Sequence, residues 1–148
     1  KEAGKLPAED AVRLQQPART AAEYVVKIAV PVFSRIANFD DLDPLSQEKE
    51  VELVMIHAGQ VIPVDAHLVL IPGSKSTIFD LQFLREQGWD IDLKAHHRRG
   101  GYILGICGGY QMLGTKIYDP DGLEGEAKET EGLGFLQIET IFCANSKV

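Results

Sequence analysis

The sequence predicts an α/β fold, with an open and mostly parallel sheet that carries helices on both faces. Runs of continuously apolar residues recur along the chain, and stretches with helical spacing or turn residues separate them. Strands that are apolar on both faces are typical of parallel sheets covered by helices on each side. The 148 residues suffice for one domain with a core and are too few for two sizeable domains.

The expected strands are rich in β-branched residues, which pack well on a pleated surface. The third of them is closed by Pro72 and Gly73, and glycines stand at or just before the start of the last one. Functional residues of such sheets gather where the strands end, so the segments after the strands are the places to look for a site. The strands are expected at residues 24–33, 51–57, 67–72, 100–107 and 133–142.

Helices are expected in the connections between these strands. Apolar residues recur at helical spacing within residues 77–88, and Gly88 is a typical helix end. A second helix is expected over residues 108–114, and a short helical turn is expected within residues 35–49, where Asp-Asp and Asp-Pro mark boundaries.

Composition narrows the class of protein. Residues 1–22 carry no sustained core pattern and are expected to be a linker, which leaves residues 23–148 for the folded domain. The net charge of −7 argues against nucleic acid or a membrane surface as partner, because both are anionic. No apolar run approaches the roughly 18 residues of a membrane span, and the amino terminus lacks a signal-peptide pattern. Two distant cysteines form no disulfide framework, so a reduced, cytoplasmic protein is expected.

Cys107 stands where the fourth expected strand gives way to a helix. This order matches a nucleophile elbow, a sharp strand-to-helix turn that exposes the nucleophile at the edge of the sheet. Such a turn strains the backbone and leaves little room for neighbouring side chains, a need that Gly105 and Gly109 meet. The helix amino terminus favours a thiolate, and the N–H of Gly108 is expected to stabilise an oxyanion.

Two interpretations of Cys107 are open, a nucleophile or a small core residue, because free cysteines are among the most often buried residues. The glycine spacing directly after a strand favours the nucleophile. Cys143 follows a strand end without any such setting and is expected to be an incidental thiol.

The segment "IPGSKST" follows the third expected strand and should lie opposite the elbow. It is not a nucleotide-binding P-loop, because Val69 and Ser74 replace the two glycines which that motif requires. We expect a loop with exposed N–H groups, in which Gly73 offers a second oxyanion donor. An ordinary Pro-Gly turn is the alternative.

A cysteine nucleophile usually needs a base, and none of the four histidines is a strong candidate. His96 and His97 lie in the basic segment "KAHHRRGG" and are expected to be solvated. His57 ends a strand, and strand ends can face a site, but it is a weak candidate for the base. No spacing of histidines, cysteines and carboxylates indicates a metal site.

Several segments together resemble a known family. They are "LVLIPGSKSTIFDLQFLREQGWD", "YILGICGGYQMLG", "GLEG" followed by "GLGFLQIET", and the shorter "RIANFDDLDPL" and "LPAED". Over most of residues 6–142 the chain is similar to the glutamine amidotransferase domain of the cobyric acid synthase family. The Gly-x-Cys-x-Gly-x-Gln element alone is typical of class I, triad-type glutaminases, and the Pro-Gly-Ser-Lys loop and "NFDDLDPL" indicate the cobalamin branch. The resemblance implies a flavodoxin-like fold that is incomplete at its carboxyl end.

The resemblance also implies a reaction. Cys107 would attack the side-chain amide of glutamine, form a glutamyl thioester and release ammonia, with oxyanion-hole N–H groups from Gly73 and Gly108. The family's ammonia reaches a separate synthetase domain, which uses ATP and magnesium to amidate four carboxylates of the corrinoid adenosyl-cobyrinic acid a,c-diamide, giving cobyric acid. This chain would hold no metal or cofactor of its own. The residues that would contact or position glutamine are Ser74, Gly109 and Gln111.

Two departures limit these implications. Neither the synthetase domain nor the segment with the family's catalytic histidine is found in these 148 residues, and "CANSKV" departs from the family after "IETIF". We therefore expect this chain alone to be inactive or nearly so. Two alternatives stay open. One is a sister amidotransferase, such as cobyrinic acid a,c-diamide synthase or a lipid II amidotransferase subunit, and the other is a non-catalytic α/β binding module.

Overall fold

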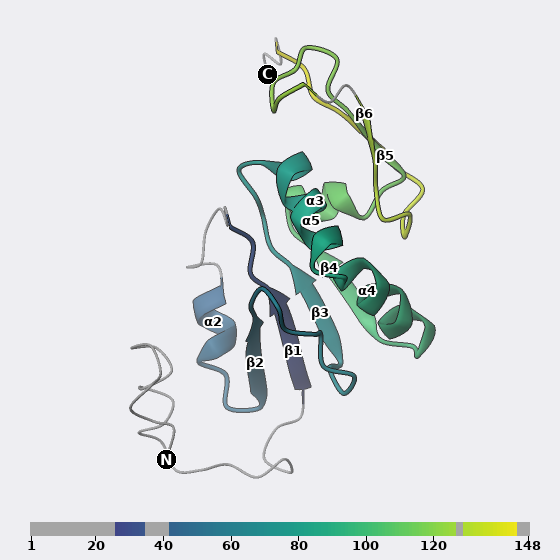
Figure 1. Cartoon of the computed structure of the whole chain (residues 1–148). Coiled ribbons are helices and arrows are strands. Elements are labelled where there is room, and N and C mark those ends of the chain that lie inside the picture. Colours follow the sequence, from purple (N-terminus) through teal and green to yellow (C-terminus); the bar gives the residue numbers. More distant parts are fainter. Residues whose placement is uncertain (1–25, 35–41, 127–128, 145–148) are drawn as a thin grey trace.

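The computed structural model describes residues 26–34, 42–126 and 129–144. The linker expected at residues 1–22 lies outside the described residues. Figure 1 shows a larger sheet with helices beside it and a smaller sheet near the carboxyl end. Across the described ranges, no helix is long and apolar enough to cross a membrane.

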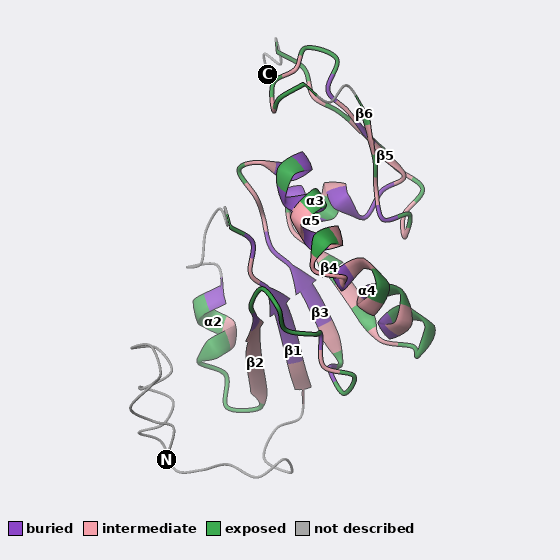
Figure 2. Cartoon of the chain, viewed as in Figure 1, coloured by how far each residue is buried: buried purple, intermediate pink, exposed green. Residues whose placement is uncertain are grey.

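The larger sheet is parallel throughout and contains four of the five expected strands. Its order is β2 (Val51–Ile56), β1 (Val26–Pro31), β3 (Leu68–Ile71) and β4 (Tyr102–Gly105). Figure 2 shows that β3 is buried along most of its length, as a central strand with both faces covered should be. The predicted parallel α/β sheet is therefore confirmed.

Helices cover both faces of this sheet, as the sequence predicts. The described helices are α2 (Asp43–Ser46), α3 (Thr77–Glu86), α4 (Trp89–Arg98) and α5 (Gly108–Met112). On one face, Leu45 of α2 packs with a cluster that includes Ile28, Val30 and Leu70. On the other face, buried side chains of α3, α4 and α5 join the residues that alternate with these along β1 and β3.

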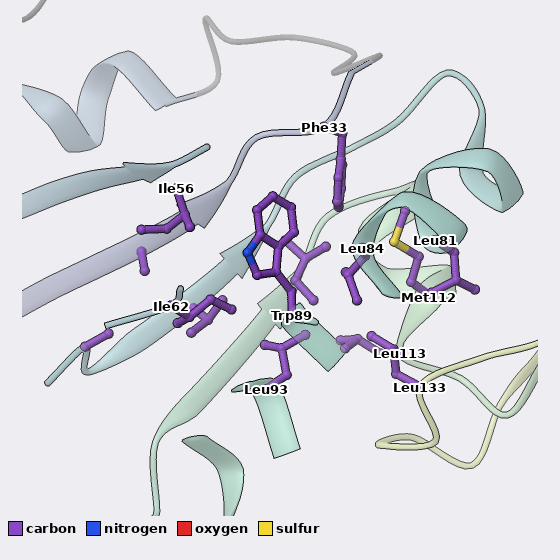
Figure 3. Packing of buried hydrophobic residues seen from close by; sticks show 14 of the residues in the cluster. Phe33, Ile56, Ile62, Leu81, Leu84, Trp89, Leu93, Met112, Leu113 and Leu133 are labelled. Carbon is purple, nitrogen blue, oxygen red and sulfur yellow. The ribbon is translucent and has the colours of Figure 1, made fainter. Parts of the chain in front are cut away.

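The main core lies on this second face, around Trp89 at the start of α4 (Figure 3). The indole ring is fully buried and meets Phe83 edge-on, with 5.8 Å between ring centroids. Its N–H donates a hydrogen bond of 2.8 Å to the carbonyl oxygen of Gln60, so the polar atom of the buried ring is satisfied. This bond holds the loop after β2 against α4.

Helix α4 was not expected, and its histidines do not both lie in solvent. His96 is buried, and its Nε2 lies 2.8 Å from the carbonyl oxygen of Tyr102. The ring occupies the space beside Gly101, where a Cβ would come within 2.1 Å of it. Trp89, Leu93 and His96 form the buried stripe of the helix at helical spacing. Charged residues between them conceal this stripe in the sequence.

The prediction of a strand over residues 133–142 is wrong for most of that range, because only Glu139–Ile141 forms a strand. Residues 133–136 instead donate N–H hydrogen bonds to carbonyl oxygens of residues 112–114, at the end of α5. These bonds wrap the segment around the helix end, and only its last part becomes a strand. The smaller sheet has the order β6 (Glu129–Glu131), β5 (Lys116–Tyr118) and β7 (Glu139–Ile141), antiparallel on one side of β5 and parallel on the other.

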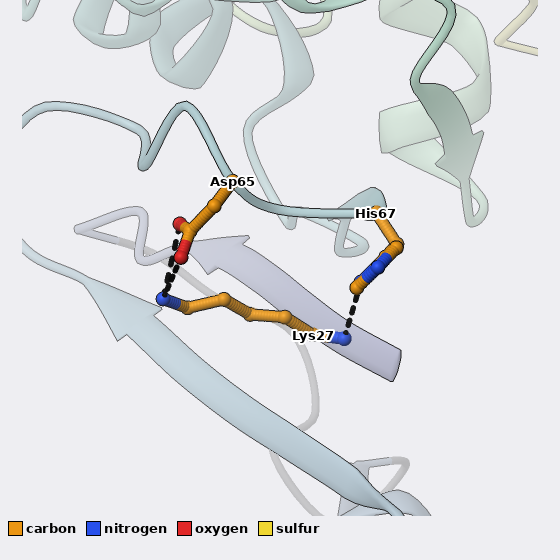
Figure 4. A network of polar contacts seen from close by, with 3 residues as sticks. All are labelled: Lys27, Asp65 and His67. Atoms are coloured by element: carbon orange, nitrogen blue, oxygen red, sulfur yellow. Dashed lines mark hydrogen bonds and ion pairs between the residues drawn. The ribbon is translucent and has the colours of Figure 1, made fainter. Parts of the chain in front are cut away.

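Two contacts at the surface connect β1 to the loop before β3 (Figure 4). Lys27 Nζ lies 3.0 and 3.1 Å from the two carboxylate oxygens of Asp65, and the Lys27 backbone N–H donates to Nδ1 of His67 at 2.9 Å. The hydrogen bond from Lys27 lowers the pKa of Asp65 below its usual value of 3.8.

This pair predicts a small pH-dependent contribution to stability. Because the pKa of Asp65 is lower in the folded state, the stabilisation is present above about pH 4 and is lost as the pH falls through the folded-state pKa. The Asp65 side chain is 69% exposed. Asp65→Asn should therefore lower the free energy of unfolding at pH 7 by only about 0.2–1 kcal/mol. In urea titrations the difference between the variant and wild type should shrink as the pH falls through the folded-state pKa of Asp65, and a difference that does not change with pH would contradict the ion pair.

Candidate active site

Cys107 lies in the sharp turn between the end of β4 and the start of α5, as the sequence predicts. Its backbone has φ 52° and ψ −114°, and it is the one non-glycine residue in the described part of the chain with a positive φ. The Gln111 N–H donates to the Cys107 carbonyl at 3.1 Å, which begins the helix directly after the turn. The thiol is exposed. This strained, exposed strand-to-helix turn is the geometry of a nucleophile elbow.

The glycines beside Cys107 are required by close packing. A Cβ on Gly105 would come within 2.6 Å of the backbone of Gly109. A Cβ on Gly109 would come within 2.2 Å of the carbonyl oxygen of Ile71, at the end of β3. The same carbonyl oxygen accepts the N–H of Ile106 at 3.0 Å. The expectation that these neighbours must lack bulk is confirmed, and the elbow sits against the end of β3.

Gly108 and Gly73 occupy the positions from which the sequence predicts oxyanion donors. A Cβ on Gly108 would stand 2.8 Å from Thr77 Oγ1 and 3.2 Å from the backbone nitrogen of Ser74, so the loop after β3 lies against the elbow. Within the described residues, neither the Gly73 nor the Gly108 N–H donates a hydrogen bond. Both N–H groups are thus available to an acceptor, and their role as an oxyanion hole stays a prediction.

Ser74 uses its hydroxyl inside the loop. The hydroxyl donates to Oδ2 of Asp80 at 2.5 Å and accepts the N–H of Ser76 at 2.9 Å. The side chain is therefore held toward the start of α3. A contact of Ser74 with bound glutamine stays a prediction, and it would have to come from the backbone or from the remaining hydroxyl lone pair.

Gln111 is positioned one helical turn after Cys107. Its side-chain Oε1 lies 3.5 Å from the hydroxyl of Thr77, which is buried at the start of α3. Helix α5 ends at Met112, earlier than expected, so the field at its amino terminus is weaker than that of a longer helix. The predicted role of Gln111 in positioning glutamine is not tested by this contact.

Two acidic residues near the site were missed by sequence reasoning. Glu124 Oε1 accepts the N–H of Ile78 at 2.9 Å and so caps the amino end of α3. Asp119 is fully buried and accepts the N–H groups of Leu123 and Glu124, each at 2.8 Å. The signal was the turn chemistry of "YDPDGLEG", in which an aspartate commonly binds N–H groups that follow it.

None of the four histidines lies where it could act as base for Cys107. His57 follows β2, which β1 and β3 separate from β4, a spacing of about 14 Å. His67 and His96 contact the backbone of Tyr102, at the opposite end of β4 from the elbow. His97, in the last turn of α4, packs against the ring of Phe135. Within the described ranges, no three histidine, cysteine or acidic side chains gather as a metal-binding group.

A strained cysteine at the strand-to-helix turn of a parallel sheet defines the class of α/β proteins with a nucleophile elbow. Residues 27–148 match the family described as CobB/CobQ-like glutamine amidotransferase domains. Because this match covers most of the sequence, the chain belongs to that family.

Similar full proteins carry a more specific name. The chain is 61% identical to cobyric acid synthase of Sinorhizobium medicae over 140 residues, covering 95% of this chain and 29% of that protein. It is 61% identical to cobyric acid synthase of Sphingopyxis alaskensis over 138 residues, covering 93% and 28%. It is 54% identical to that of a Jannaschia species over 147 residues, covering 99% and 30%. The chain thus spans less than a third of the length of these relatives.

Gly109→Ala tests the packing of the elbow. The added methyl group would stand 2.2 Å from the Ile71 carbonyl oxygen, so β3 and the elbow must move apart. We expect a loss of about 1–3 kcal/mol in the free energy of unfolding, measured by urea denaturation. Tyr110→Ala is the matched control, because its side chain is 47% exposed, and should cost less. Equal effects of the two substitutions would contradict the close approach.

Proposed function

We propose that this chain is the front portion of the glutamine amidotransferase domain of a cobyric acid synthase. The observation that carries the proposal is Cys107 with a strained, positive-φ backbone at the strand-to-helix turn. The identity of 61% to cobyric acid synthases across nearly the whole chain supports the choice of reaction. It also weighs against the sister amidotransferases and a non-catalytic module.

In the proposed reaction, the Cys107 thiolate attacks the side-chain amide carbon of glutamine. The carbonyl oxygen becomes an oxyanion, which the N–H groups of Gly73 and Gly108 stabilise by hydrogen bonding. Collapse of this intermediate breaks the carbon–nitrogen bond, leaves a glutamyl thioester and releases ammonia once the nitrogen has gained a proton. Water then hydrolyses the thioester to glutamate and frees the thiol. The exposed thiol and the two available N–H groups support this sequence of steps.

Glutamine would be held beside the elbow by groups from both loops. Gln111 lies one turn after the nucleophile with its side-chain oxygen on Thr77. Gly109 brings the elbow into contact with the end of β3. Ser74 contributes from the loop opposite. Contacts of glutamine with these groups would place its side-chain amide carbon over the Cys107 thiol, and this orientation lowers the barrier to attack.

The rest of the proposed activity belongs to other parts of a longer protein. The relatives are more than three times as long as this chain. We assign the catalytic base to a histidine outside this chain, and ATP and magnesium to a separate synthetase domain. There the ammonia would amidate carboxylates of adenosyl-cobyrinic acid a,c-diamide, in the cytoplasm and without a nucleic-acid or membrane partner. Residues 1–22 would form the linker to that domain, and residues 23–148 the front of the amidotransferase domain.

Cys107→Ala in the full-length protein separates the two half-reactions. Without the thiol, glutamine-dependent formation of cobyric acid should fall at least about a thousandfold. Amidation with added ammonium salt should persist, because ammonia enters after the cysteine step. The measurement is product formation with each nitrogen source, by chromatography of the corrinoids.

Cys143→Ala is the matched control and should leave both activities unchanged, because Cys143 lies outside the elbow. Retention of glutamine-dependent activity in Cys107→Ala would overturn the proposed function. So would an equal loss in the two variants.

A further inference from the structure

Asp80, in the first turn of α3, is a buried carboxylate that the proposed reaction does not use. It is fully inaccessible to solvent, and hydroxyl groups from two separate segments donate to it. Ser74, in the loop after β3, donates to Oδ2 at 2.5 Å, and Ser34, which follows β1, donates to Oδ1 at 3.3 Å. Burial of a carboxylate is costly, and these bonds together with the helix amino terminus offset the cost.

The Ser74 hydroxyl donates to Oδ2 of Asp80, so its hydrogen points at the carboxyl group. This direction sets how the Ser74 side chain is turned. The Ser74 oxygen then faces the N–H of Ser76, from which it accepts at 2.9 Å. The Asp80 backbone N–H in turn donates to the Ser76 carbonyl at 2.9 Å. The loop that begins at Gly73 is thereby fixed to the start of α3 by two kinds of contact with Asp80: the Ser74 side chain binds its carboxyl group, and the Ser76 carbonyl binds its backbone N–H.

This fixed loop is the one that lies against the elbow. The Ser74 backbone nitrogen stands 3.2 Å from the position of a Cβ on Gly108, next to the nucleophile. The loop's own bonds do not consume the Gly73 N–H. A change in how Ser74 is held would therefore shift the donor that faces the reacting carbonyl.

We propose that Asp80 is a positioning residue for the glutaminase reaction, acting through Ser74 to hold the Gly73 N–H in the geometry that stabilises the oxyanion. This inference rests on the proposed function. Asp80 does not itself touch glutamine. The oxyanion exists only during the reaction, so misplacing its donor weakens binding of the transition state more than binding of glutamine. The effect should appear in kcat and leave KM nearly unchanged.

The test uses the full-length protein and measures kcat and KM for glutamate formation. Asp80→Ala should lower kcat on the order of 10- to 100-fold, with KM within about threefold of wild type. Ser74→Ala cuts the same connection from its other end and should give a similar loss. The double variant should be no slower than the slower single variant, because both remove one connection.

Ser34→Ala is the matched control. It removes the hydroxyl that donates to Oδ1 of Asp80 and leaves the Ser74 bond to Oδ2 in place, so kcat should stay within about twofold of wild type. Ammonia-dependent amidation, measured for every variant, should be unchanged and reports that the rest of the protein is folded.

An unchanged kcat in Asp80→Ala would overturn the inference. If Asp80→Ala does not fold, the Ser74→Ala variant tests the inference instead. An unchanged kcat in Ser74→Ala, or a change in KM alone, would overturn the inference as well. Additive losses in the double variant, or a loss in Ser34→Ala as large as in Ser74→Ala, would make Asp80 a structural residue only. Failure of the proposed function itself would give a different result, because glutamine-dependent activity would then persist in the Cys107→Ala variant.

Discussion

The close approach of the elbow to the end of β3 is the constraint on which the rest of the site depends. The Ile71 carbonyl oxygen accepts the Ile106 N–H at 3.0 Å and leaves no room for a side chain on Gly109. This contact keeps two neighbouring strand ends together, so the loop from Gly73 lies beside the thiol. The positive-φ backbone at Cys107 costs about 1–3 kcal/mol, which the packing around it must offset.

Two loops from adjacent parallel strands thus meet at one edge of the sheet, each with a separate task. The loop after β4 carries Cys107, the proposed nucleophile, and the loop after β3 carries Gly73, the proposed second N–H donor. Buried carboxylates hold the surroundings of the loop after β3: Asp80 binds that loop directly, and Asp119 shapes the loop from which Glu124 reaches α3. If the proposed oxyanion donors are Gly73 and Gly108, the loop after β3 is fixed before any substrate arrives, which is the condition for effective electrostatic catalysis.

The parts that could be predicted from the sequence are those determined by local patterns. Apolar β-branched runs predicted the four parallel strands, and the glycine spacing around Cys107 predicted the elbow. Helix α4 was not predicted because charged residues separate Trp89, Leu93 and His96 in the sequence. The smaller sheet was not predicted because residues 133–136 wrap around the end of α5 before the last strand begins. The contacts of Ser34 with Asp80 and of Ile78 with Glu124 join residues 46 apart, so no local pattern reports them.

Covalent labelling with a diazo-ketone analogue of glutamine tests the central claim, that Cys107 is an activated nucleophile in an assembled elbow. The chain carries its own control, because Cys143 is also an exposed free thiol. Intact mass and peptide mapping should show one modification, on Cys107, that added glutamine suppresses, with Cys143 spared. Equal labelling of both cysteines, or labelling of neither, would contradict the account, because exposure alone would then explain the reactivity or the elbow would not bind glutamine.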